Sequence, residues 1–251
     1  MPDLSNTSSF AHPPTCALIL AAGKGSRLGA HAGDRPKPLV PLAGRPIIEH
    51  NIVLCCQAGV TELCINLHHL GDQIVTQLGD GSRWNVHITY SHEAELLGTA
   101  GAVVPFRSIL ETGHFYVVYG DNYSQCDLRA LWQAHQRTGA DMTVAVHERP
   151  DVRGSGVVIM DSTDRIVDLI EKPTGELPDS RWVNAGIYLM EPSLLADIGP
   201  GASDFARDHI PRWIRAGKRV FGFRLHTPVL AIDTPEQLYQ AQQQLKTTPP
   251  L

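Results

Sequence analysis

The sequence predicts an α/β fold with a Rossmann-like, mostly parallel mixed sheet and helices on both faces. Two observations lead to this class. In the first half, short runs rich in Val, Ile and Leu alternate with stretches of helical spacing, which is typical of parallel strands joined by crossover helices. In the second half, three strand-like runs follow one another with short links, which indicates an antiparallel patch beside the parallel strands.

The expected strands are short and apolar, or alternate between apolar and polar residues. In the first half they are Cys16–Ala22, Glu62–Leu67, Val86–Tyr90, Phe115–Tyr119 and Met142–Val146. In the second half they are Gly156–Met160, Ile166–Ile170, Val183–Met190 and Val220–Leu225.

The expected helices have apolar residues at helical spacing between turn signals. They are Ile47–Gln57, Asp72–Leu78, Thr99–Leu110, Leu128–Arg137, Asp204–Ala216 and Thr234–Leu245. Gly139 ends the fourth helix, and Thr234 followed by Pro235 is a good start for the last one. With no linker-like segment or internal repeat, we expect one domain over residues 15–247, after a flexible extension of residues 1–14 that is rich in Ser, Thr, Asn and Pro.

Composition and charge narrow the classes of partner. A net charge of −5 and a pI near 6.2 disfavour a general nucleic-acid or membrane surface, so an anion site must be a local cluster of basic residues. No stretch approaches the roughly 20 apolar residues of a membrane span, and the N-terminus does not read as a signal peptide. The five cysteines lie mostly in apolar runs without Cys-x-x-Cys spacing, so we expect reduced thiols in a cytoplasmic protein.

A glycine-rich loop follows the first expected strand, and three kinds of phosphate loop compete for it. A Walker A loop requires Gly-x4-Gly-Lys-Ser/Thr, which the segment 23–26 does not supply. A dinucleotide-binding loop requires Gly-x-Gly-x-x-Gly; Gly23 and Gly25 fit, but position 28 is leucine and the next glycine is Gly29. The third kind, a nucleotidyltransferase loop, fits best.

In that interpretation the strand ending at Leu20 delivers Ala21, Ala22 and Gly23, whose small side chains let a base and ribose lie against the backbone. The N–H groups of Gly25 and Ser26 can then face a triphosphate. Arg27 offers a planar fork for phosphate oxygens and Lys37 a point charge, which the neighbouring prolines hold on a stiff segment.

Together with later motifs, this loop resembles the sugar-1-phosphate nucleotidylyltransferase family, over nearly the whole chain after the extension. The motifs are Leu20–Arg27 with Pro36-Lys37-Pro38, Asn66–Gly71, Leu97–Gly101, Gly120-Asp121-Asn122, Glu171-Lys172-Pro173 and Val183–Gly186. The resemblance implies Mg²⁺-assisted, in-line attack of a sugar 1-phosphate on the α-phosphate of an NTP, giving an NDP-sugar and pyrophosphate. It is closest to mannose- or heptose-1-phosphate guanylyltransferases.

The resemblance also implies roles for individual residues. Arg27 would hold the leaving pyrophosphate, and Lys37 would bridge the α-phosphate and the incoming phosphate. Lys172 would hold the sugar phosphate, and Glu171 would accept hydrogen bonds from sugar hydroxyls. Asn122, Gly156 and Asn184 are the further residues expected on the sugar-phosphate side.

Two aspartates are the expected metal ligands. Asp121 comes at the carboxyl end of an apolar strand and suits Mg²⁺, which prefers carboxylate and phosphate oxygens. The chain departs from the family at the second ligand, since the usual aspartate position is Ala231. Asp233 lies two residues later, on the same side of an extended chain, so we expect it to take over. The alternative is that Asp233 only caps the last helix.

The motifs indicate less clearly which nucleotide base is bound. Glu93 precedes the turn at Gly98 and Thr99, where the family contacts the base edge, and a carboxylate accepts hydrogen bonds only. This favours guanine, or else uracil or thymine, over adenine and cytosine. We expect GTP as the nucleotide. Two other kinds of enzyme are alternatives: a uridylyl- or thymidylyltransferase acting on, for example, N-acetylmuramate or glucose 1-phosphate, and a phosphocholine-type cytidylyltransferase. A nucleotide-binding regulatory module is the alternative that is not an enzyme. We expect a monomer or a small homo-oligomer.

Overall fold

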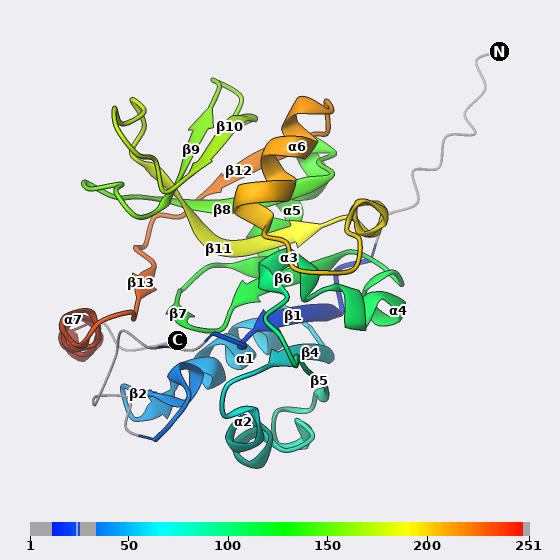
Figure 1. Cartoon of the computed structure of the whole chain (residues 1–251), viewed down its shortest axis with the longest axis vertical. Coiled ribbons are helices and arrows are strands. Elements are labelled where there is room, and N and C mark those ends of the chain that lie inside the picture. Colours follow the sequence, from blue (N-terminus) through cyan, green and yellow to red (C-terminus); the bar gives the residue numbers. More distant parts are fainter. Residues whose placement is uncertain (1–11, 24, 26–33, 248–251) are drawn as a thin grey trace.

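Four parallel strands form the half of the sheet that carries the glycine-rich loop. In the computed structural model, which describes residues 12–23, 25 and 34–247, they lie in the order β6-β1-β4-β5 (Figure 1). Their bounds are β1 Cys16–Leu20, β4 Glu62–Leu67, β5 His87–His92 and β6 Phe115–Tyr119. The chain moves from β1 outward to β4 and β5 and then returns to the other side of β1 with β6. A ligand crevice is expected at such a switch point, outside the carboxyl ends of the strands.

The second half completes the same nine-stranded sheet. Its strands are β8 Met142–Glu148, β9 Gly156–Met160, β10 Ile166–Glu171, β11 Trp182–Met190 and β12 Val220–Arg224. Strand β11 runs antiparallel to β6, β8 and β9, while β12 runs parallel to β8. The predicted fold class, including the antiparallel patch, is confirmed.

Alternating side chains of the central strand divide the core into two apolar layers. Ala17 and Ile19 face one layer, which is covered by α1 (Ile47–Gln57), α2 (Gly71–Leu78) and α5 (Leu128–Thr138). Leu18 faces the other, which is covered by α3 (Gly98–Gly101), α4 (Arg107–Leu110) and α6 (Ile210–Arg215). Burial of apolar surface on both faces is the main source of stability for such a sheet.

Two predicted helices are interrupted, and the segments in which they begin contribute residues to the pocket described below. The segment expected to be one helix over Thr99–Leu110 consists of α3, a 3₁₀ turn at Val104–Phe106 and α4. Pro105 inside that turn has no N–H to donate, which stops a continuous helix. The helix expected over Asp204–Ala216 begins with a π-helical turn, η6 (Phe205–His209), before α6. Pro211 cannot donate to the carbonyl four residues earlier, so a regular α-helix cannot run through this segment.

The other predicted elements occur within two residues of their expected bounds. Short elements add to them: β2 Pro41–Leu42, β3 Arg45–Pro46, β7 Asn122–Tyr123, β13 Leu230–Ala231, and the 3₁₀ turns η2 Lys37–Leu39, η3 Ser82–Trp84 and η5 Pro192–Asp197. Within the described ranges, no helix combines the length and apolar character needed to cross a bilayer.

The last helix brings the end of the chain back to the first half. In α7 (Pro235–Thr247), the hydroxyl of Thr234 accepts the N–H of Gln237 at 3.3 Å, so the predicted start of this helix is confirmed. Leu238 and Ala241 pack against Val40 and Leu42, and β13 pairs with β7 (Figure 1). This packing sets the loop between β13 and α7 beside the carboxyl end of β6.

Candidate active site

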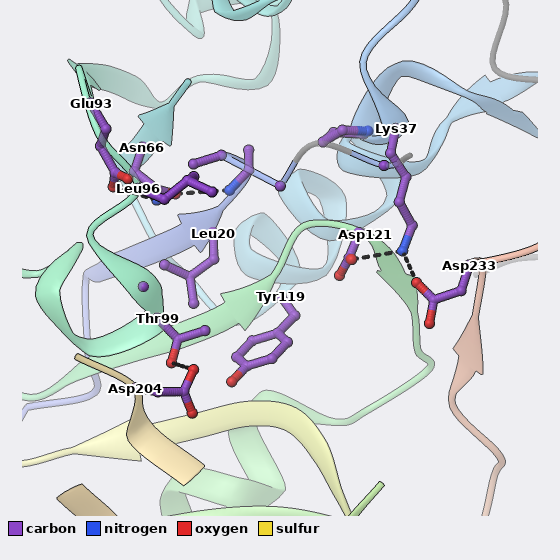
Figure 2. A pocket seen from close by; sticks show the side chains of 16 residues that line it. Leu20, Lys37, Asn66, Glu93, Leu96, Thr99, Tyr119, Asp121, Asp204 and Asp233 are labelled. Atoms are coloured by element: carbon purple, nitrogen blue, oxygen red, sulfur yellow. Dashed lines mark hydrogen bonds and ion pairs between the residues drawn. The ribbon is translucent and has the colours of Figure 1, made fainter. Parts of the chain in front are cut away.

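A pocket of about 380 Å³ opens where β1, β4 and β6 end (Figure 2). The register explains why these ends meet, because Leu20 pairs with both Asn66 and Tyr119. The volume lies within the range of small-molecule sites. The pocket is lined by Leu20, Ala21, Ala22, Gly23, Gly25, Lys37, Pro38, Asn66, Glu93, Leu96, Gly98, Thr99, Tyr119, Asp121, Asp204 and Asp233.

Most of the predicted nucleotide and metal residues are brought together here. Those that line the pocket are Leu20, Ala21, Ala22, Gly23, Gly25, Lys37, Glu93, Gly98, Thr99, Asp121 and Asp233. Ser26 and Arg27 lie outside the described residues. The sugar-phosphate residues Asn122, Gly156, Glu171, Lys172 and Asn184 are not part of this lining.

Lys37 holds the two predicted metal carboxylates together. Its Nζ donates to Asp121 Oδ2 at 2.7 Å and to Asp233 Oδ1 at 2.6 Å, and the lysine is only 4% exposed (Figure 2). Gly25 lies against the lysine stem at a φ of +60°, and a Cβ there would be 2.7 Å from Lys37 Cβ. Only glycine lets the phosphate-loop backbone pass so close to this side chain.

The same arrangement fits a divalent cation. Asp121 and Asp233 direct carboxylate oxygens at one point, and they already share a cation there in the lysine ammonium. Mg²⁺ is commonly held by one or two carboxylates plus substrate phosphates and water. Among the residues that the structure describes, no group of three or more His, Cys, Asp or Glu side chains could hold a metal, so these two aspartates would need the substrate to complete the shell.

A buried polar chain fixes the ends of the strands around the pocket. The N–H of Ala21 donates to Asn66 Oδ1 at 2.8 Å, and Asn66 Nδ2 donates to Glu93 Oε1 at 2.8 Å. Glu93 Oε2 accepts the N–H of Leu97 at 2.9 Å. Each Glu93 oxygen therefore accepts one bond from the protein and keeps a lone pair for a ligand. The sequence interpretation did not assign Asn66 to the site, although an asparagine one residue before the end of a buried strand was a visible signal.

The segment before η6 packs closely against the Gly98–Gly101 turn and is hydrogen-bonded to it. The N–H groups of Ala100 and Gly101 donate to the carbonyl of Ser203 at 3.0 and 3.2 Å. A Cβ at Gly101 would lie 2.5 Å from the carbonyl oxygen of Gly201. The small residues of this motif thus permit two backbones to touch.

Thr99 is bonded across this contact. Its hydroxyl donates to Asp204 Oδ2 at 2.8 Å and accepts the N–H of Phe205 at 2.9 Å (Figure 2). Asp204 and Tyr119 line the pocket but were not predicted. Tyr119 ends the predicted strand β6, whereas the position of Asp204 depends on contacts with a distant part of the chain.

Three of the predicted sugar-side residues form a second group. A Cβ at Gly156 would lie 2.7 Å from Glu171 Oε2 and 3.5 Å from Asn184 Cβ. Asn184 Nδ2 donates to the Tyr188 hydroxyl at 2.6 Å, and that hydroxyl lies 3.1 Å from the hydroxyl of Tyr119. Because Tyr119 lines the pocket, this chain of hydrogen bonds connects the second group to it.

The charged groups around Glu171 have opposing effects on the pKa of its carboxyl. Burial raises the pKa of the Glu171 carboxyl; Lys172 lowers it and Asp204 raises it further. Lys172 Nζ lies 3.7 Å from Glu171 Oε1 with its side chain 68% exposed. The remaining predicted residue, Asn122, is in β7, where its carbonyl accepts a hydrogen bond from Asn51 Nδ2 at 3.1 Å.

Fold and pocket together define an α/β protein with a pocket of small-molecule size at the carboxyl edge of its sheet. Residues 16–246 match the family model described as nucleotidyl transferase, and the chain belongs to this family. The resemblance to the sugar-1-phosphate nucleotidylyltransferases is confirmed.

Relatives with different substrates are similar to this chain. A UTP–glucose-1-phosphate uridylyltransferase from Synechocystis is 32% identical over 218 residues, which cover 80% of this chain and 55% of that protein. A mannose-1-phosphate guanyltransferase from Schizosaccharomyces pombe is 33% identical over 228 residues, which cover 88% of this chain and 61% of that protein. The chain therefore spans little more than half the length of these curated relatives.

The fold also matches a solved structure. HddC from Yersinia pseudotuberculosis, complexed with GMP-PN, superposes with a TM-score of 0.77 at 24% identity, covering 92% of this chain and all of that one. At this identity the match supports the fold.

Proposed function

We propose that this chain transfers a nucleoside monophosphate from an NTP to a sugar 1-phosphate, giving an NDP-sugar and pyrophosphate. One observation carries the proposal: a buried lysine held between two carboxylates, at the mouth of a glycine-rich loop that ends the first strand. Family membership gives the class of reaction, and the substrate and site assignments are our inference.

The chemistry needs positioning more than a strong base. The attacking phosphate is already anionic, so the obstacles are repulsion between anions and the charge on the departing pyrophosphate. Lys37 would leave its bridge to the aspartates and contact the α-phosphate and the incoming phosphate. The loop around Gly25 would bind the triphosphate. Arg27 remains a predicted contact for the leaving group.

Asp121 and Asp233 would hold Mg²⁺ when it is bound, and the ion would neutralise charge on the triphosphate. The position of Asp233 beside Asp121, across Lys37, supports the shifted second ligand over a helix cap alone. Thr234 supplies the hydroxyl that accepts the N–H of Gln237 at the start of α7.

On the acceptor side, Lys172 would contact the sugar phosphate, and Glu171, Asn184, Gly156 and Asn122 would surround the sugar. For the base we propose guanine, since Glu93 has free lone pairs for the N–H donors of its edge. A mannose- or heptose-type 1-phosphate is the proposed acceptor. Relatives acting on glucose 1-phosphate with UTP keep a uridylyltransferase as the alternative.

The rival function is a nucleotide-binding regulatory module without turnover, which the alanine at position 231 favours. We expect instead an enzyme of the cytoplasm, monomeric or a small homo-oligomer.

The test is pyrophosphate release from each common NTP with mannose, heptose, glucose, N-acetylglucosamine and N-acetylmuramate 1-phosphates, with and without Mg²⁺. A single Mg²⁺-dependent pair with clear turnover would name the reaction. Tight nucleotide binding with no release in any combination would favour the regulatory module.

A further inference from the structure

Asp204 is a pocket residue with no role in the proposed chemistry so far. It precedes η6, where its Oδ1 accepts the N–H groups of Ala206 and Arg207 at 3.0 and 3.1 Å. Its Oδ2 accepts the Thr99 hydroxyl at 2.8 Å. A carboxylate has about four lone-pair sites. Asp204 can therefore accept a further hydrogen bond while both of its oxygens stay fixed by the fold.

The side of the pocket that Asp204 occupies is the one that adjoins the predicted sugar site. Tyr119 lies between Asp121 and Asp204 in the pocket and is hydrogen-bonded through Tyr188 to Asn184 (Figure 2). Strand β10, which ends in Glu171, packs against η6. The Asp204 carboxylate is close enough to Glu171 to contribute to its raised pKa.

Two cations lie near these carboxylates, and both have largely exposed side chains. Lys172 and Arg207 have side chains that are 68% and 67% exposed. Arg207 is already engaged by Asp208 through two hydrogen bonds of 2.9 Å. Lys172 is the group assigned to the phosphate of the acceptor. The sugar ring would therefore meet hydrogen-bond acceptors and negative charge.

We propose that Asp204 is a specificity-determining residue that, together with Glu171, selects neutral polyhydroxylated sugar 1-phosphates and excludes sugars carrying a carboxylate. This inference rests on the proposed function and narrows its acceptor. Sugar hydroxyls donate to fixed carboxylate oxygens, whereas a carboxylate substituent brings no donor and a like charge. Hexose and heptose 1-phosphates match this pair of carboxylates, and N-acetylmuramate 1-phosphate does not.

The test compares two pairs of acceptors in which one member carries a carboxylate, at C6 of the ring in the first pair and on a lactyl ether in the second. Glucose is paired with glucuronate 1-phosphate, and N-acetylglucosamine with N-acetylmuramate 1-phosphate. The variant is Asp204→Asn, which removes the charge but retains a good helix-capping side chain. The matched control is Asp168→Asn, an exposed aspartate of β10 outside the pocket lining.

The wild-type protein should prefer the neutral member of each pair. In Asp204→Asn the neutral-to-acidic ratio of kcat/KM should fall by about tenfold or more for at least one pair, as expected for one charged hydrogen bond and one repulsive charge. Asp168→Asn should keep the wild-type ratio. An unchanged ratio for both pairs in Asp204→Asn, or an equal loss in the control, would overturn the proposal.

Two further measurements allow the proposal to be tested even if the variant does not fold or the wild-type protein shows no turnover. If Asp204→Asn does not fold, Asp204→Ser offers another neutral capping residue at the same position. If the wild-type protein turns over no acceptor, the proposed function fails. The selectivity is then read from calorimetric Kd values of the four sugar 1-phosphates, with a non-hydrolysable NTP analogue present. Equal affinity for neutral and acidic members would contradict the role of Asp204 even there.

Discussion

The carboxylate of Asp233 lies 2.6 Å from the ammonium nitrogen of Lys37, although 196 positions separate the two residues in the chain. The contact depends on α7 packing against β2 and on β13 pairing with β7. The chain thus uses its last helix to complete a site that begins with its first strand. Because Lys37 also binds Asp121, the three side chains form one unit.

Replacing Asp233 tests whether the shifted carboxylate is essential. Asp233→Ala should lower kcat by about 10²–10³-fold, the loss expected when one preorganised charge contact is removed from a transition state. It should also raise the Mg²⁺ concentration needed for half-maximal pyrophosphate release. Asp164→Ala, which removes an exposed partner of Arg224, is the control and should remain active. Near-normal turnover of Asp233→Ala would exclude this residue as an essential ligand.

Lys37→Met should make the stability of the protein depend on Mg²⁺. Without the ammonium group, Asp121 and Asp233 lose the cation that bridges them, and Mg²⁺ binding only to the folded chain would reduce their repulsion. We expect millimolar Mg²⁺ to raise the Tm of this variant by at least about 2–4 °C more than that of the wild type. Lys218→Met, outside the pocket lining, should behave as the wild type. A Tm of Lys37→Met that responds to Mg²⁺ no more than the wild type does would contradict the shared site.

Gly101→Ala should disturb the contact between α3 and the segment before η6. The added methyl would lie 2.5 Å from the carbonyl of Gly201, so the unfolding free energy should fall by about 1–3 kcal/mol, as for other overpacked sites. Gly113→Ala is the matched control, since no heavy atom lies within 4 Å of its added Cβ. Urea unfolding measures both, and equal stability of the two variants would show that the contact is not tight.

The raised pKa of Glu171 predicts an acid limit on activity. The carboxyl takes up its proton above its usual value near 4.5, because burial and Asp204 disfavour the charged form. If the ionised form accepts the sugar hydroxyls, kcat/KM should fall as the pH drops through this raised value.

Asp204→Asn removes one of these causes and should move the acid limb to lower pH. The sugar phosphate titrates identically with both proteins, so the comparison isolates the enzyme. An acid limb that stays in place would show that Glu171 does not control it.

The ionisation of Glu171 affects the stability of the fold in the opposite direction from activity. The folded chain binds this proton more tightly than the unfolded chain, so Glu171 favours folding below its unfolded pKa and disfavours folding above its folded pKa.

The sequence predicted the fold well because periodicity and strand length are local properties. Strands β1, β4 and β6 are nearly continuous apolar runs, which is typical of buried parallel strands. Helical spacing runs through both interrupted helices, but Pro105 and Pro211 break them locally. In addition, α3 and η6 are shaped by their contact through the carbonyl of Ser203. Helical spacing alone carries no information about that contact.

The site was predictable where motifs coincide with strand ends. Lys37, Asp121 and Asp233 were chosen from the sequence and line one pocket, although the metal-binding role of the two aspartates and the phosphate contact of Lys37 stay predictions. Asn66 lies one residue before the end of β4 and could have been assigned from this position. Asp204 could not, because contacts with a distant part of the chain place it in the pocket, among them its hydrogen bond with the hydroxyl of Thr99, a residue 105 positions away.

The most direct test of nucleotidyl transfer at this pocket follows the two ends of the triphosphate separately. An NTP labelled at the α-phosphate and one labelled at the γ-phosphate are each incubated with Mg²⁺ and the acceptor found in the substrate screen. We predict that the α-label enters the NDP-sugar and the γ-label enters pyrophosphate in equal yield, and that Asp233→Ala and Lys37→Met lose both. Release of the γ-label as inorganic phosphate, or equal transfer by these variants, would contradict the account.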